Sequence, residues 1–295
     1  MPKVQEMGAQ DEEDMWRELD DFLNMVFSQL ETAKFLSRRL YRFFVYSDIS
    51  ESVENGIIEP LAQTLFDNDY ELIPALERLL SSKHFYDEDD NNNEDEIIGG
   101  LIKSPLELMF QAVSVFEPET PYIQTHNEDH FQTYWHAMED FFVPANMPRF
   151  LPENVAGFPA YYQEPGFSQL WFNSSTLISR YRLPNMLLTH KRFSSKSNKG
   201  GIKIDIVGFV RFSGHFTSPE DADALVQTFI DYLLPEPVTD ERFNYFREAL
   251  LGGLSNINWN NEWNNYLASG NDAAVYSALS NFILTILASP EYQLF

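Results

Sequence analysis

Apolar residues recur at intervals of three and four positions along much of the chain, and this spacing limits the fold more than any other feature. Side chains at this spacing share one face of an α-helix, and in most globular proteins that face is buried. The first such stripe, between Glu12 and Leu30, contains Met15, Leu19, Phe22, Leu23, Val26, Phe27 and Leu30. Further stripes cover residues 33–45, 61–66, 73–80, 219–233 and 272–288. The sequence therefore predicts a mainly α fold with a compact multi-helix body, in which the first stripe is buried.

Local signals mark several helix ends. Ser104–Glu107 combines a capping serine, a proline at the first helical position and a glutamate suited to a capping box. Ser218–Asp221 has the same arrangement with aspartate, and Thr239 precedes another helical stretch. Gly252–Gly253 suits a left-handed helix end. We expect helices to begin at the first three of these signals and to end at the fourth.

Two segments depart from the helical pattern. Pro144–Gly166 carries five prolines, spaced too closely for a helix or a central strand, so a loop is expected. In Ile202–Phe212 the first isoleucines alternate with charged residues, which is the periodicity of a strand. The sequence predicts at most a small β-hairpin there, beside the helical body.

The same patterns predict the domain organisation. Residues 1–10 read as a disordered N-terminal edge, and residues 11–295 as a single helical domain. Two lobes, at about 11–190 and 213–295, are expected within it, joined by the segment that contains the predicted strand.

The charge balance excludes some classes of partner. Acidic residues number 45 against 20 basic ones, and the formal net charge is −25. Such a chain repels phosphate backbones and anionic lipid headgroups, so nucleic acid is not expected as a partner. The absence of cysteine excludes disulfides, thiolate metal sites and cysteine nucleophiles. No apolar run approaches the length of a membrane span, and the first fifteen residues do not contain the apolar region of an export signal.

Motifs for metals, cofactors and catalysis are absent or incomplete. His126–His130 reads HNEDH and lacks the glutamate placement of zinc helices. Asp87–Glu96 is rich in oxygen ligands, but a calcium loop beginning at Asp87 would need glycine where Asn92 stands and glutamate where Ile98 stands. There is no nucleophile elbow, phosphate-binding loop or dinucleotide fingerprint. We therefore expect neither a metal nor a cofactor, and no residue is identified as catalytic.

The proline-rich segment carries the strongest candidates for ligand binding, which are Phe158, Tyr161, Tyr162, Trp171 and Arg180. Phe158 and Trp171 are expected to anchor the loop. The two tyrosines combine apolar faces with hydroxyl groups, which suits a glycan or a peptide equally. Arg180 offers a counter-charge to an anionic group of the ligand. The alternative is that the aromatic rings pack in the core and that the arginine neutralises a nearby carboxylate.

Two other groups of residues have a structural and a functional interpretation. Trp259 and Trp263 lie one helical turn apart among asparagines, as on a sugar-binding surface, but packing is the commoner use of such a pair. Arg38, Arg39 and Arg42 form a basic group in an acidic chain, and we expect them to pair with neighbouring carboxylates.

Several segments together resemble a known family. They are ETAKFLSRRLYRFFV, IIEPLAQTLFDNDYELIPALERLLSSKHFY, IKSPLELM, PENVAGFPAYYQEPGFSQLWFNSSTLISRYRLPN and the closing LASPEYQL. In their order they resemble the bacterial family filed as domain of unknown function 1800, from about Asp11 to Phe295. Gly157-Phe158 stands where the family usually has Gly-Trp. Because members are usually longer, the chain resembles the C-terminal half of such a protein.

The resemblance implies an extracytoplasmic bacterial protein, often encoded beside a sulfatase-like secreted partner, and it supplies no established activity. We therefore expect an interaction or assembly module of the cell envelope with no catalytic centre in this half. Its expected partner is the sulfatase-like protein or a glycan. The alternative is a glycan-acting hydrolase that uses carboxylates which spacing does not identify. Whether the chain is an enzyme stays open at this stage.

Overall fold

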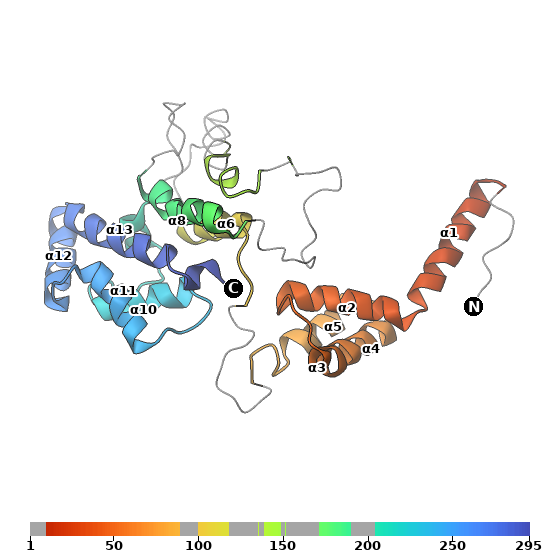
Figure 1. Cartoon of the computed structure of the whole chain (residues 1–295). Coiled ribbons are helices and arrows are strands. Elements are labelled where there is room, and N and C mark those ends of the chain that lie inside the picture. Colours follow the sequence, from red (N-terminus) through yellow and green to blue (C-terminus); the bar gives the residue numbers. More distant parts are fainter. Residues whose placement is uncertain are drawn as a thin grey trace. The chain divides into compact units, whose positions relative to one another are not determined.

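A computed structural model of the chain describes residues 10–88, 100–117, 135, 139–148, 151, 171–189 and 204–295 (Figure 1). The chain divides into two compact units, Met1–Gly100 and Leu101–Phe295. The predicted single domain with lobes at about 11–190 and 213–295 stays a prediction. Most of its expected disordered edge, residues 1–9, lies outside the described residues.

The first unit is a small bundle preceded by one amphipathic helix. Its elements are α1 (Glu12–Phe27), α2 (Leu30–Phe44), α3 (Glu51–Val53), the π-helical turn η1 (Glu54–Ile58), α4 (Glu59–Asp67) and α5 (Leu72–Leu80). Helix α4 packs against both α2 and α5. The core consists of Ala33, Tyr41, Val45, Ile58, Leu61, Ala62, Leu65, Ala75 and Leu79. The bundle therefore rests on residues of α2, η1, α4 and α5, with none from α1.

Helix α1 contradicts the prediction of a buried stripe. Asp11 caps it by accepting a hydrogen bond from the backbone N–H of Asp14 at 2.8 Å, and acidic residues fill its first turn. None of its residues is buried within the unit, and it leads away from the α2–α5 bundle (Figure 1). Periodicity predicts the helix correctly, but whether another element covers its apolar face depends on tertiary packing.

Arg38 forms ion pairs with two carboxylates of the first unit, as the sequence predicted. Its guanidinium donates to both carboxylate oxygens of Glu54, the shortest bond running from Nη2 to Oε1 at 2.6 Å. Its Nη1 donates to Glu31 at 2.7 Å. Glu54 opens the π-helical turn, so this forked contact links α2 to η1. The expectation that Arg38 pairs with carboxylates is confirmed.

The second unit is organised around its last long helix. Its elements are α6 (Pro105–Phe116), α8 (Ser174–Thr189), α9 (Ile206–Phe212), α10 (Ala222–Leu233), α11 (Asp240–Leu251), α12 (Asn256–Ser269), α13 (Ala273–Leu287) and the short 3-10 turn η3 (Glu291–Gln293). Helix α13 contacts α8, α9, α11 and α12, and Figure 1 shows α8 and α11 on opposite sides of it. It buries Leu279, Phe282 and Ile283 completely, as expected of a helix surrounded by others.

Three of the four predicted helix ends are confirmed. Ser104 and Glu107 form both bonds of the capping box of α6, and Thr239 caps α11. Gly252 ends α11 in the left-handed conformation with φ of +59°. The predicted start at Ser218 is wrong, because α10 begins at Ala222 with Asp221 as its cap.

The late start of α10 has a tertiary cause, since the preceding residues bond to α12. The carbonyl oxygen of Pro219 accepts a hydrogen bond from Nε1 of Trp259 at 2.9 Å, and that of Glu220 accepts one from Asn260 at 3.3 Å. Trp259 and Trp263 are both buried, with ring centroids 5.9 Å apart. Their packing interpretation is therefore confirmed.

The predicted hairpin is also wrong for residues 204–212. Asp205 caps α9 by accepting from the backbone N–H of Gly208 at 2.9 Å, and the helix buries Ile206, Val207 and Val210. Those three positions fit one face of a helix, whereas the alternation that predicted a strand ends where α9 begins. Among the described residues the structure shows no strand, and its isolated β-bridge joins Ile102 to Leu294. The mainly α fold class is confirmed.

Candidate functional site

The predicted ligand-binding residues are only partly described. Phe158, Tyr161 and Tyr162 lie outside the described residues, as do His126–His130 and most of Asp87–Glu96. Trp171 and Arg180 are described and are buried, with 1% and 0% of their surface exposed. Burial of Trp171 suits the expected anchoring role.

Arg180 lies on α8 and bonds to two distant segments. Its Nε donates to Oε1 of Gln293 at 2.9 Å, and its Nη2 donates to the carbonyl oxygen of Lys103 at 2.6 Å. The guanidinium carbon lies 5.2 Å from the centre of the Phe172 ring. Nη1 has no hydrogen-bond partner in the described part of the chain. Within that part Arg180 does not bond to a carboxylate, so the simple neutralisation considered from the sequence is not seen there.

A second buried cation, Lys103, lies beside Arg180. Its Nζ donates to the carbonyl oxygen of Tyr292 at 2.9 Å and faces the rings of Tyr292 and Phe295 at 4.7 and 5.3 Å. Burial lowers the pKa of Lys103 to about 8 and that of Arg180 to about 10, because each charged form loses its hydration. Burial therefore disfavours the charged form of each side chain, and its hydrogen bonds and ring contacts compensate for only part of that cost.

The two cations hold the C-terminal segment against the residues that precede α6. The backbone N–H of Lys103 donates to Gln293 at 2.8 Å, and that of Phe295 donates to Leu101 at 2.9 Å. With these bonds, Arg180 joins three parts of the chain. A ligand would reach its guanidinium only if the surrounding residues moved. The proposed ligand contacts of Trp171 and Arg180 stay a prediction.

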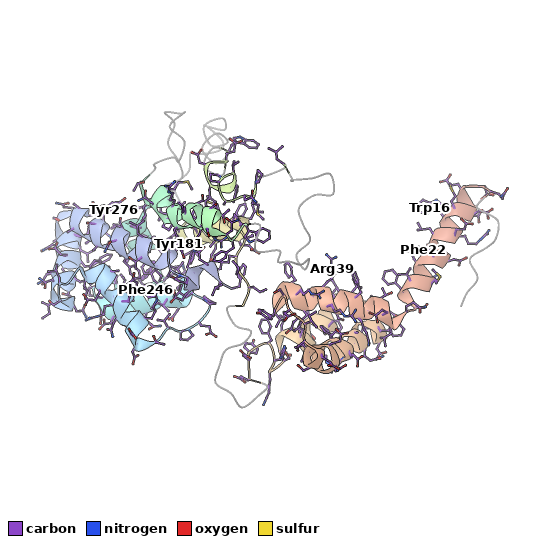
Figure 2. The ribbon with its side chains drawn as sticks, viewed as in Figure 1. Trp16, Phe22, Arg39, Tyr181, Phe246 and Tyr276 are labelled. Atoms are coloured by element: carbon purple, nitrogen blue, oxygen red, sulfur yellow. The ribbon has the colours of Figure 1, made fainter. Side chains whose placement is uncertain are left out.

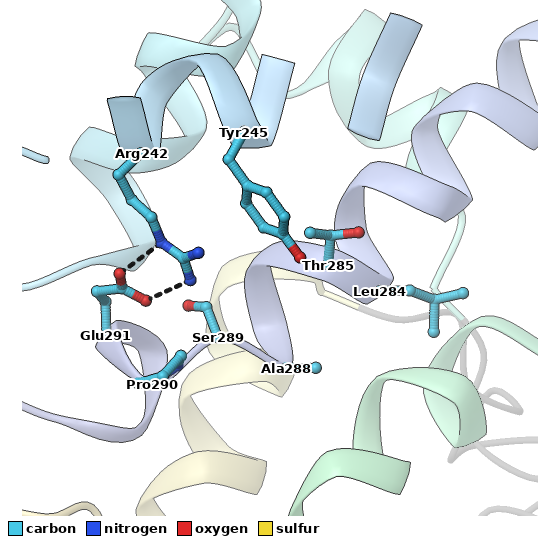
Figure 3. A pocket seen from close by; sticks show the side chains of 8 residues that line it. All are labelled: Arg242, Tyr245, Leu284, Thr285, Ala288, Ser289, Pro290 and Glu291. Carbon is cyan, nitrogen blue, oxygen red and sulfur yellow. Dashed lines mark hydrogen bonds and ion pairs between the residues drawn. The ribbon is translucent and has the colours of Figure 1, made fainter. Parts of the chain in front are cut away.

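On its other side the C-terminal segment borders an open pocket of about 660 Å³. The pocket lies between α11, the end of α13 and η3 (Figure 3). Its lining residues are Arg242, Tyr245, Leu284, Thr285, Ala288, Ser289, Pro290 and Glu291. Polar groups gather where α11 faces η3, and aliphatic carbons come from α13 and the residues after it. We take this pocket as the candidate site.

An ion pair forms one edge of the pocket. Nε of Arg242 donates to Oε1 of Glu291 at 2.6 Å and Nη2 donates to Oε2 at 3.0 Å, a bidentate arrangement. The guanidinium carbon lies 4.6 Å from the ring centre of Tyr245 and 4.7 Å from that of Phe246. Burial disfavours the charged form of Glu291, but the hydrogen bonds and charge of Arg242 outweigh it and hold its pKa below the ordinary value.

Sequence reasoning missed this pocket for a clear reason. Arg242 and Tyr245 stand three positions apart on one helix, which places them side by side, but Glu291 is 49 residues further along from Arg242. Only the fold brings the two parts together. The closing LASPEYQL segment was the one signal that pointed to this end of the chain.

The described residues show neither a metal-binding cluster nor a membrane-spanning helix. They contain no group of three or more histidines, aspartates or glutamates placed to hold a metal ion. Among them, no helix combines the length and the apolar character that crossing a membrane requires.

Comparison with known proteins places the chain in a family. The model for the family described as "Protein of unknown function (DUF1800)" matches residues 3–294. The chain belongs to the DUF1800 family. No curated protein and no solved structure matches it.

The structure shows what the closing segment does in this DUF1800 protein. Glu291 pairs with Arg242 at the pocket, while the two residues that follow it bond to the buried cations. Ser289 accepts a hydrogen bond from the backbone N–H of Tyr292 at 3.3 Å, which steadies the turn. This short segment thus builds the edge of the candidate site and fixes it to α8 and to the residues that precede α6.

Proposed function

We propose that this DUF1800 protein is an interaction module of the bacterial cell envelope, located outside the cytoplasm, and that it has no catalytic centre of its own. The observation that carries the proposal is the apolar face of α1, none of whose residues is buried within its unit. Large exposed apolar patches on soluble proteins mark surfaces that contact partners.

The face is formed by large side chains at helical spacing. Its exposed members are Met15, Trp16, Leu19, Phe22, Leu23 and Phe27. Trp16 is 60% exposed and Phe22 is 50% exposed, and Figure 2 shows both projecting from α1. An amphipathic helix with a free apolar face binds by laying that face into an apolar groove. We call these six residues the α1 face.

The charged residues that border the α1 face indicate the chemistry of the partner. Helix α1 carries six carboxylates and a single arginine. A second copy would bring like charges together, and an anionic membrane would repel them. We therefore expect a protein with an apolar groove bordered by lysines and arginines.

A smaller pocket of about 460 Å³ extends the α1 face at its C-terminal end. It is lined by Asn24, Phe27, Ser28, Phe66, Asp69 and Tyr70. The hydroxyl of Tyr70 donates to the carbonyl oxygen of Phe27 at 2.8 Å, and the two rings meet edge to face. This contact fixes the end of α1. The pocket beside it is apolar apart from Asn24, Ser28 and the carboxylate of Asp69, so it suits a long basic side chain of the partner.

The test replaces Phe22 with a photo-crosslinking amino acid in the full chain, expressed in its native host. We expect light to produce a discrete cross-link to another protein, which mass spectrometry identifies. The purified partner should then bind the wild-type chain in calorimetry. Substitution Phe22→Asp should abolish that binding, and added salt should weaken it because the charged residues that border the α1 face are mostly acidic. The sulfatase-like secreted protein is the first purified partner to test.

The matched control places the same cross-linker at Glu77, an exposed position on α5 of the same unit. It should give no such product. Cross-links confined to the same chain or to a second copy would contradict the proposal, as would equal products from the two positions.

The alternative, a glycan-acting hydrolase, lacks a matching observation in the described residues. Hydrolysis of a glycosidic bond generally uses two carboxylates, roughly 5–10 Å apart, one of them with a raised pKa. The candidate pocket has Glu291 alone, and its pKa is lowered. Release of reducing ends from a polysaccharide by the whole chain would favour the hydrolase.

A further inference from the structure

We propose that the pocket between α11 and η3 binds a neutral carbohydrate without cleaving it. The inference concerns the second unit and does not depend on the α1 face. The pocket combines planar polar groups, an exposed aromatic ring, a balanced pair of charges and hydroxyl groups.

The ion pair presents hydrogen-bonding groups in one plane. Arg242 uses Nε and Nη2 for Glu291, and its Nη1 makes no hydrogen bond to any described residue. The carboxylate oxygens of Glu291 retain further lone pairs. Neighbouring hydroxyls of a sugar ring both donate and accept hydrogen bonds, so they match a fixed donor beside a fixed acceptor.

Tyr245 supplies the apolar surface. It is 54% exposed, and the guanidinium of Arg242 packs on its ring. Figure 3 shows the side chain directed along the pocket, with its hydroxyl toward Thr285. An exposed aromatic ring covers the C–H face of a sugar while the polar groups beside it bind the hydroxyls.

Two hydroxyl groups complete the arrangement. Thr285 donates its hydroxyl hydrogen to the carbonyl oxygen of Asn281 at 2.8 Å, which leaves its oxygen as an acceptor. Ser289 accepts from the backbone of Tyr292, and its own hydroxyl hydrogen is directed to the carboxylate of Glu291, which it helps to position. On the α13 side the pocket therefore offers the Thr285 oxygen as an acceptor for a ligand hydroxyl.

The charge balance selects a neutral ligand. The ion pair cancels the charge at the edge of the pocket, so an anion would meet Glu291 and a cation would meet Arg242. The net charge of −25 further disfavours sulfated and carboxylated glycans. Cleavage is not expected, because a carboxylate whose pKa is lowered does not serve as the general acid.

The experiment titrates the full chain with cellohexaose, maltohexaose and chitohexaose by calorimetry and ligand-observed NMR. We expect saturable binding of at least one of them with a Kd of about 1 mM or lower. Tyr245→Ala should weaken that binding about tenfold. Glu291→Gln should weaken it too, because it removes the acceptor and releases Arg242. No hexasaccharide should be shortened after incubation.

Tyr232→Ala is the matched control, because Tyr232 is 48% exposed on α10 and does not line the pocket. It should bind like the wild type, and circular dichroism should show all variants folded. Absence of saturable binding up to about 10 mM would overturn the proposal. So would equal losses in the two tyrosine variants, or tighter binding of a heparin hexasaccharide than of every neutral one.

Discussion

Arg180 donates a hydrogen bond to the carbonyl oxygen of Lys103 at 2.6 Å, although the two residues are 77 positions apart and both carry buried positive charge. The same guanidinium binds Gln293. One side chain therefore fixes α8, the residues before α6 and the C-terminal segment to each other. Because that segment also carries Glu291, the geometry of the candidate pocket depends on this contact.

Replacing Arg180 should therefore destabilise the second unit. Arg180→Met leaves two buried acceptors without their donor, and we expect a loss of about 3 kcal/mol in the free energy of unfolding. Arg180→Lys should not restore it, because one ammonium group does not reproduce the forked geometry. Urea denaturation measures the change. Arg182→Met, at an exposed neighbour on α8, should change stability by less than about 0.5 kcal/mol.

Lys103 predicts a dependence of stability on pH. Its pKa is about 8 in the folded chain against 10.5 for the free side chain. Between these values the unfolded chain binds more protons, so stability should rise with pH. The expected gain between pH 8 and pH 10 is about 2 kcal/mol. Denaturation at several pH values checks this, and Lys103→Met should remove most of the rise, leaving the smaller contribution of Arg180 near pH 10. A flat profile in the wild type would contradict the buried charge.

The exposure of α1 predicts that its apolar residues contribute little to folding. Phe22→Ser should change the free energy of unfolding by less than about 0.5 kcal/mol. Leu65→Ala, in the buried core of the same unit, should cost about 2–5 kcal/mol. Thermal and chemical denaturation compare the two. Equal losses would mean that the α1 face is covered in the folded protein.

Two glycines predict opposite effects of the same substitution. Gly252 has φ of +59°, so Gly252→Ala should destabilise by about 1 kcal/mol. Gly56 lies within the helical turn η1, and nothing lies within 4 Å of where its Cβ would be. Gly56→Ala should therefore stabilise by about 0.5–1 kcal/mol. The denaturation midpoints of the two variants should move in opposite directions.

The sequence alone predicted the features that depend on neighbouring residues. The capping box of α6, the threonine cap of α11 and the glycine end at Gly252 were all expected, because each is completed by hydrogen bonds or dihedral angles within one turn. The helical fold class followed from periodicity for the same reason. Packing of Trp259 and Trp263 was also the preferred interpretation.

Tertiary structure decided everything that depends on distant residues. Periodicity placed a helix over α1 but did not reveal that none of its apolar residues is buried within the unit. Residues 206–212 form a helix because Ile206, Val207 and Val210 lie on one helical face, which packs into the core. Helix α10 starts late because Trp259 donates a hydrogen bond to the carbonyl oxygen of Pro219. The ion pair of Arg242 and Glu291 spans 49 positions. Local sequence patterns do not predict contacts between such distant residues, because these contacts form only when the whole unit packs.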